Sequence, residues 1–77
     1  MKIEYTDYAE VKIQKRGLSK SQIESVLTNP DKILDGDEGR KVAQKIIGKY
    51  ILRVVFEESG NAYKVITAYY SKPDRYK

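Results

Sequence analysis

The sequence predicts one α+β domain, in which two N-terminal helices pack on a three- or four-stranded antiparallel sheet. Three observations support this fold class. Apolar residues recur at helical spacing before residue 30, the period becomes that of strands from residue 31 onward, and the strand-like runs are joined by very short connections. With 77 residues the chain has room for a single domain, 1–77, in which we expect residues 72–77 to form a flexible tail.

The first helix is predicted to begin at Thr6 or Asp7, because either side chain can cap it with an oxygen. Gly17 is expected to end it as a left-handed C-cap. Residues 3–5, which precede this helix, form either a short strand or an extended lead-in. The chain therefore enters its first helix within a few residues of its start.

The second helix carries stronger signals. Ser19 and Gln22 form a capping box, and Leu18 can pack against Ile23 as a hydrophobic staple. Pro30 ends the helix, because the residue before a proline is pushed away from the α region.

Strands are predicted at residues 32–34, 40–47, 50–57 and 62–71, where Val, Ile, Tyr and Thr are frequent. Two-residue turns at Gly48-Lys49 and Ser59-Gly60 fix a register that divides the side chains between two faces. We expect the core face to hold Ala43, Ile47, Leu52, Val54, Phe56, Tyr63, Val65, Thr67 and Tyr69. The opposite face is expected to hold Val42, Gln44, Ile46, Ile51, Arg53, Val55, Lys64, Ile66, Ala68, Tyr70 and Lys72. Because that second face is partly apolar, we expect something to cover it: another chain, a dimer mate or the tail.

Composition limits the chemistry that is available. The chain has no Cys and no His, which excludes disulfides, thiolate metal sites and histidine acid–base catalysis. The acidic turn around Asp37 lacks the spacing of a calcium loop, so we expect no metal and no cofactor. No apolar run approaches the roughly 20 residues that span a bilayer, and the N-terminus resembles no signal peptide, so we expect a cytoplasmic protein.

The segment 67–76 is the densest group of Tyr, Lys and Arg in a chain of formal charge +4. Aromatic rings among cations can stack bases and neutralise phosphates, which makes RNA one candidate ligand. The alternative is structural: Tyr69 packs in the core, while Lys72, Arg75 and Lys77 keep the tail soluble.

A family resemblance rests on six segments in a fixed order. They are Tyr5-Thr6-x-x-Ala9, Arg16-Gly17-Leu18-Ser19, Val26-Leu27-x-Asn29-Pro30-Asp31, Gly48-Lys49-Tyr50-Ile51-Leu52-Arg53-Val54-Val55, Val65-Ile66-Thr67-Ala68-Tyr69 and Lys72-x-x-Arg75-Tyr76. Together they resemble the small family catalogued as domain of unknown function 4258. That family is in turn similar to the RelE/ParE superfamily of toxins and, more loosely, to the BrnT ribonuclease toxins.

The resemblance implies metal-independent RNA cleavage by attack of a ribose 2′-hydroxyl on the adjacent phosphate, with an antitoxin as protein partner. It implies catalytic roles for Arg53, Tyr70, Lys72 and Arg75. Gln44, Lys64 and Tyr76 would then contact the nucleic acid. The protein itself would be a monomer or a homodimer.

One position departs from the family pattern. The family commonly has His before the Ala of the first helix, where this sequence has Tyr8 and Ala9. A phenol is a poor base at neutral pH without help. The alternative expectation is therefore a catalytically inactive relative that binds protein or nucleic acid. Arg53 likewise has a structural alternative, a surface ion pair with Glu57 on the same face.

Overall fold

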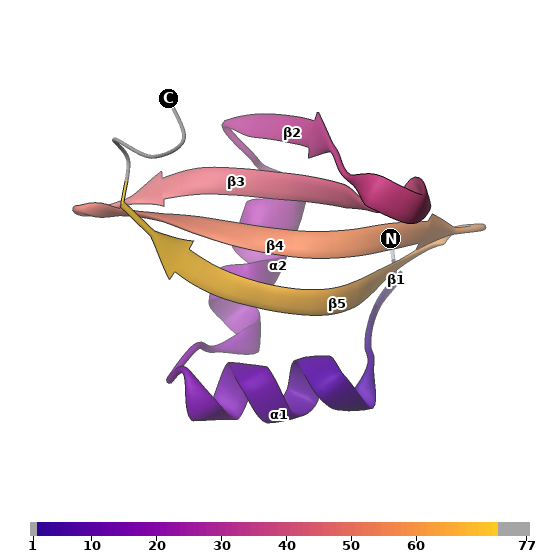
Figure 1. Cartoon of the computed structure of the whole chain (residues 1–77), viewed down its shortest axis with the longest axis horizontal. Coiled ribbons are helices and arrows are strands. Elements are labelled where there is room, and N and C mark those ends of the chain that lie inside the picture. The colour runs from indigo at the N-terminus through magenta and orange to yellow at the C-terminus, as the bar shows by residue number, and fades with distance from the viewer. Residues whose placement is uncertain (1, 73–77) are drawn as a thin grey trace.

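A computed structural model describes residues 2–72, which form an α+β fold with one five-stranded mixed sheet (Figure 1). The strands are β1 (Lys2–Tyr5), β2 (Lys32–Asp35), β3 (Lys41–Ile47), β4 (Tyr50–Ser59) and β5 (Ala62–Ser71), in the spatial order β1-β5-β4-β3-β2. Helix α1 (Asp7–Lys15) runs beside β5, and α2 (Lys20–Thr28) crosses one face of the sheet (Figure 1). A single 3-10 turn, η1 (Asp37–Gly39), joins β2 to β3.

The predicted three- or four-stranded antiparallel sheet is wrong. Strand β1 pairs in parallel with β5, with Ile3 opposite Tyr63, and this makes the sheet mixed and five-stranded. The pairing joins opposite ends of the described chain, so no turn residue in the sequence signals it. A strand of four residues also offers little periodicity by which to recognise it.

Both predicted helices are confirmed, together with their capping residues. The Oγ1 of Thr6 accepts a hydrogen bond from the Ala9 N–H at 3.0 Å, and Gly17 has a left-handed φ of 68°. Ser19 and Gln22 form the reciprocal capping box that the sequence predicts. These local signals suffice because each cap satisfies backbone groups within one turn of its own residue.

The core lies between the helices and one face of the sheet, which we call the helix face. Its largest fully buried side chains are Phe56, Ile23, Leu52, Val26, Val54 and Val65. Ala9 and Ile13 of α1 and Leu18 of the interhelical turn join the same cluster. The other side of the sheet, away from α2, is called the open face below.

The β3–β4 hairpin has the predicted register, with Ala43 opposite Val54 and Gln44 opposite Arg53. The β4–β5 register differs from the prediction. Ser59 pairs with Ala62, so residues 60–61 form the connection in place of Ser59-Gly60. A register shift follows, because Val55 pairs with Thr67 whereas Phe56 pairs with Val65.

Ile66 is therefore the extra residue of a β-bulge, and the bulge reverses the faces of the residues that follow it. Thr67 and Tyr69 were expected in the core but lie on the open face, opposite Val55 and Arg53. Ala68 and Tyr70 were expected on the open face but lie on the helix face, where Ala68 is fully buried. The bulge lies where β1 ends, and there the Thr6 N–H donates to the Val65 carbonyl at 3.1 Å.

Candidate functional site

The open face is hollowed beside the bulge into a broad depression of about 620 Å³. Its floor comes from the middle of β4 and β5, and its walls come from the start of α1 and from the residue before β3. The lining residues are Thr6, Tyr8, Arg40, Val55, Glu57, Lys64, Ile66 and Thr67. Ile66, the extra residue of the bulge, is itself one of the lining residues, so the depression lies at the point where the ladder between β4 and β5 is interrupted.

Charged side chains of both signs line one side of the depression. Glu57 and Lys64 are cross-strand partners on the open face, and Arg40 Nε lies 3.1 Å from Glu57 Oε1. The Arg40–Glu57 pair has a counterpart on the helix face, where Lys41 Nζ lies 2.9 Å from Glu58 Oε1. The Glu58 carboxylate raises the pKa of Lys41 by accepting this hydrogen bond and by its negative charge. Only the Arg40–Glu57 pair faces the depression.

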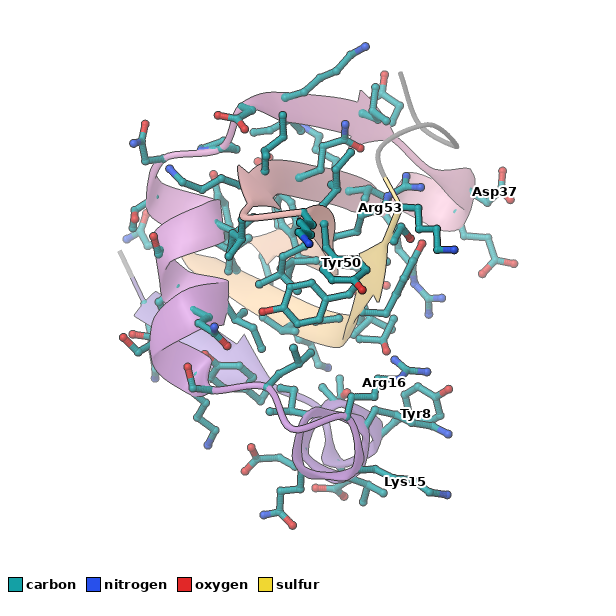
Figure 2. The ribbon with its side chains drawn as sticks, turned by 90° about the vertical axis from the view of Figure 1, so that its left-hand side faces the viewer. Tyr8, Lys15, Arg16, Asp37, Tyr50 and Arg53 are labelled. Atoms are coloured by element: carbon teal, nitrogen blue, oxygen red, sulfur yellow. The ribbon has the colours of Figure 1, made fainter. Side chains whose placement is uncertain are left out.

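Helix α1 supplies the opposite wall. Tyr8 lies in its first turn and is 56% exposed, and the ammonium of Lys12 lies 5.3 Å from the centre of its ring. Figure 2 shows Tyr8 and Lys15 projecting from α1 on the side away from α2. The phenol is thus accessible from the depression, in contrast to the buried Ala9 beside it.

A stack of two arginines and a tyrosine extends from the depression along the open face. The guanidinium carbons of Arg16 and Arg53 lie 6.0 and 5.9 Å from the ring centre of Tyr69. Arg16 also donates to Thr67 Oγ1 at 3.1 Å and to the Ala68 carbonyl at 2.8 Å. Arg16 therefore ties the end of α1 to the second half of β5, beyond the point where β1 stops.

A family model described as domain of unknown function (DUF4258) matches residues 5–70, which is most of the chain. The chain belongs to the DUF4258 family. No curated protein and no solved structure gives a significant match.

The structure separates the site residues predicted for this DUF4258 domain. Lys64 lies in the depression, whereas Gln44 and Arg53 are only 6% and 8% exposed on the open face. Tyr70 and Lys72 line a different pocket at the end of the sheet, and Tyr70 is on the face opposite to Arg53. Arg75 and Tyr76, like the rest of the tail expected beyond Lys72, lie outside the described residues.

Of the eight residues that line the depression, only Lys64 is among the site residues that the sequence predicts. Tyr8 departs from the family pattern, but the sequence alone does not assign it a role in the site. Arg40 and Glu57 could have been found, because the confirmed hairpin register places residue 40 opposite residue 57. Thr67 could not, since its place on the open face depends on the bulge.

Among residues 2–72, no group of three or more acidic side chains is arranged to hold a metal ion, the turn around Asp37 included. Within the same residues, neither helix is long and apolar enough to cross a membrane. The depression combines charged side chains of both signs with an exposed phenol.

Proposed function

We propose that this DUF4258 domain is a toxin-like protein that targets RNA, as its resemblance to the RelE/ParE toxins implies, and that it cleaves RNA without a metal ion. One observation carries the proposal: a carboxylate, two cations and an exposed phenol line the same open depression. Glu57 is the carboxylate, Arg40 and Lys64 are the cations, and Tyr8 is the phenol. Attack by a neighbouring hydroxyl on a phosphodiester requires a proton acceptor, a proton donor and positive charge at the phosphate.

Each residue has a role in the proposed reaction. Glu57 accepts the proton of the ribose 2′-hydroxyl, whose oxygen forms a bond to the adjacent phosphorus. The bond between phosphorus and the 5′-oxygen breaks, and Tyr8 gives its phenolic proton to that oxygen. Arg40 and Lys64 stabilise the negative charge that develops on the phosphate. The products are a 2′,3′-cyclic phosphate and a 5′-hydroxyl.

This arrangement favours Arg40 over Arg53 as the cation that meets the phosphate. Arg53 is 8% exposed and contacts the ring of Tyr69, so a phosphate could reach little of it. The catalytic roles first predicted for Arg53, Tyr70, Lys72 and Arg75 stay predictions.

A second candidate function is RNA binding without cleavage. The favouring observation is the 3.1 Å contact between Arg40 Nε and Glu57 Oε1. The Arg40 guanidinium already occupies one oxygen of this carboxylate, so that oxygen is not open to a ribose hydroxyl. Lys64 and Tyr8 would then bind phosphate and base, and the Arg40–Glu57 pair would be structural.

The test measures RNA cleavage and RNA binding by purified protein, with and without ribosomes. We expect Glu57→Gln to lower the cleavage rate by about 10²- to 10⁴-fold, the usual contribution of a general base. Lys64→Gln should weaken RNA binding most at low salt, because phosphate contacts depend on counterion release.

The counterpart pair provides matched controls on the helix face. Glu58→Gln removes the same charge as Glu57→Gln from the same strand, β4, and Lys41→Gln removes one positive charge from β3. Neither of these charges faces the depression. Equal rates for Glu57→Gln and Glu58→Gln would refute the catalytic role of Glu57. If the protein binds RNA without cleaving it, and Lys64→Gln weakens this binding whereas Lys41→Gln does not, the second candidate, RNA binding without cleavage, is supported. Neither binding nor cleavage by the wild-type protein would refute both.

An antitoxin is the protein partner that the toxin proposal implies. Induced expression of the domain alone should then arrest growth of the host, and co-expression of a small protein from the neighbouring gene should relieve that arrest. Normal growth at high expression would contradict the toxin proposal.

A further inference from the structure

Two tyrosines lie side by side at the end of the sheet farthest from the bulge. Tyr50 begins β4, and Tyr70 lies near the end of β5 opposite Leu52, so both are on the helix face. Their ring centres are 6.0 Å apart at an interplanar angle of 60°. Tyr50 and Tyr70 are 48% and 39% exposed, whereas Leu52, which lies opposite Tyr70, is fully buried. Figure 2 looks onto this end of the sheet, where Tyr50 faces the viewer.

The two rings line a pocket of about 330 Å³ together with Ser71 and Lys72. This volume is at the lower end of the range for small-ligand pockets, roughly 300–1,000 Å³. The walls combine aromatic surface, a hydroxyl and an ammonium group. A flat ring with a negative charge nearby matches these walls, because the ring can pack on tyrosine and the charge can pair with Lys72.

We propose that Tyr50, Tyr70, Ser71 and Lys72 form a second RNA subsite, which stacks one nucleobase and pairs Lys72 with a neighbouring phosphate. The inference rests on the proposed RNA-targeting function and adds a contact outside the depression. Base–aromatic stacking is tolerant of sequence, so the subsite adds affinity without base specificity.

The subsite also sets a minimum length for the RNA. The depression and the pocket lie on opposite faces of the sheet, and the eight residues from Lys64 to Lys72 alone span about 26 Å at roughly 3.3 Å per residue. An RNA that contacts both must therefore be at least this long and pass around the end of the sheet. A dinucleotide is too short to reach both places, whereas a dodecanucleotide is long enough. Longer RNA should therefore bind more tightly than short RNA, and the gain should depend on the tyrosines.

The test is fluorescence anisotropy with end-labelled oligouridylates of two and twelve nucleotides. We expect Tyr50→Ala to weaken binding of the dodecanucleotide by about 5- to 150-fold, which corresponds to the roughly 1–3 kcal/mol of one stacked base. Tyr50→Phe keeps an aromatic ring and should bind like the wild type. Equal affinities for the alanine and phenylalanine variants would overturn the proposal.

A second measurement uses only the wild-type protein and so does not depend on how a variant folds. Titration with uridine 5′-monophosphate should shift the NMR signals of the Tyr50 and Tyr70 ring protons, and unshifted signals would overturn the subsite. If the protein binds poly-L-proline tightly and Tyr50→Ala abolishes that binding, the pocket is a peptide site and the proposed RNA subsite is overturned. Failure of the proposed cleavage function can be told apart from failure of the subsite. In that case RNA is not cleaved, but binding of the dodecanucleotide still depends on Tyr50.

Discussion

Replacing Arg16 with alanine is expected to remove the contacts that hold the end of α1 on β5. The guanidinium donates to the Ala68 carbonyl at 2.8 Å and to Thr67 Oγ1 at 3.1 Å, and it lies over the ring of Tyr69. Strand β1 ends opposite Val65, so Arg16 takes the place of a neighbouring strand along this part of β5. Loss of the side chain leaves a backbone carbonyl to be satisfied by water.

The magnitude follows from these contacts. Hydrogen bonds from a charged donor contribute about 1.5–3 kcal/mol, and an exposed cation–π contact contributes about 0.5–1 kcal/mol. Because Arg16 is itself exposed, water replaces much of what is lost, and we expect a net loss of about 1.5 kcal/mol. For a domain of this size, that loss lowers Tm by about 6–12 °C.

The assay is thermal unfolding followed by circular dichroism, with Lys15→Ala as the matched control. Lys15 is the preceding residue, is also exposed and also carries one positive charge. Its replacement should change stability by less than about 0.5 kcal/mol, as is usual for surface positions. If the two variants unfold at the same temperature, Arg16 does not hold α1 on β5 and the reasoning is refuted.

Two further predictions concern the contact that joins β1 to α2 and the cap at the start of α2. Tyr5 donates its phenolic proton to Glu24 at 2.9 Å, and burial, that hydrogen bond and the nearby carboxylates raise the pKa of Tyr5 above its usual value. The unfolded chain therefore loses this proton first as the pH rises past about 10, so wild-type stability should fall there. Tyr5→Phe should be about 1 kcal/mol less stable than the wild type at pH 7, because it loses the hydrogen bond. Urea unfolding should show that the difference in unfolding free energy between the two proteins becomes smaller by pH 11. A difference that stays constant would contradict the pKa shift. Ser19→Ala removes the acceptor for the Gln22 N–H at 3.1 Å and should lower the free energy of unfolding by about 1 kcal/mol. The readout is a fall in Tm of about 4–8 °C, and Ser21→Ala, at an exposed position, is the control. Equal Tm values for the two variants would contradict the role of the cap.

The parts of this fold that the sequence predicts are those that depend on local chemistry. The capping box of Ser19 and the helix end at Gly17 act within a few residues, and both are observed. The β3–β4 register follows from the turn that begins at Gly48, whose φ of 62° places it in the left-handed region. Each of these features depends on residues that are neighbours in the chain.

The parts that the sequence does not predict depend on distant contacts. The parallel pairing of Ile3 with Tyr63 joins residues 60 positions apart, and no short turn connects the two strands. The bulge at Ile66 lies in an unbroken run of strand-forming residues, without a glycine to mark it. Thr6, which precedes α1, lies next to the bulge, and its Oγ1 donates to the Ile66 carbonyl at 3.4 Å.

The bulge also decides which side chains can act together. Without the extra residue, Tyr70 would lie on the same face as Arg53, as the sequence analysis expects. With it, Tyr69 takes that place beside Arg53, while Tyr70 moves to the helix face next to Tyr50. Because the side-chain period of a strand is two, one inserted residue is enough for this exchange. The same insertion that separates Tyr70 from Arg53 puts Thr67 on the open face, where it lines the depression, so the bulge determines part of the lining of both the depression and the pocket at Tyr50.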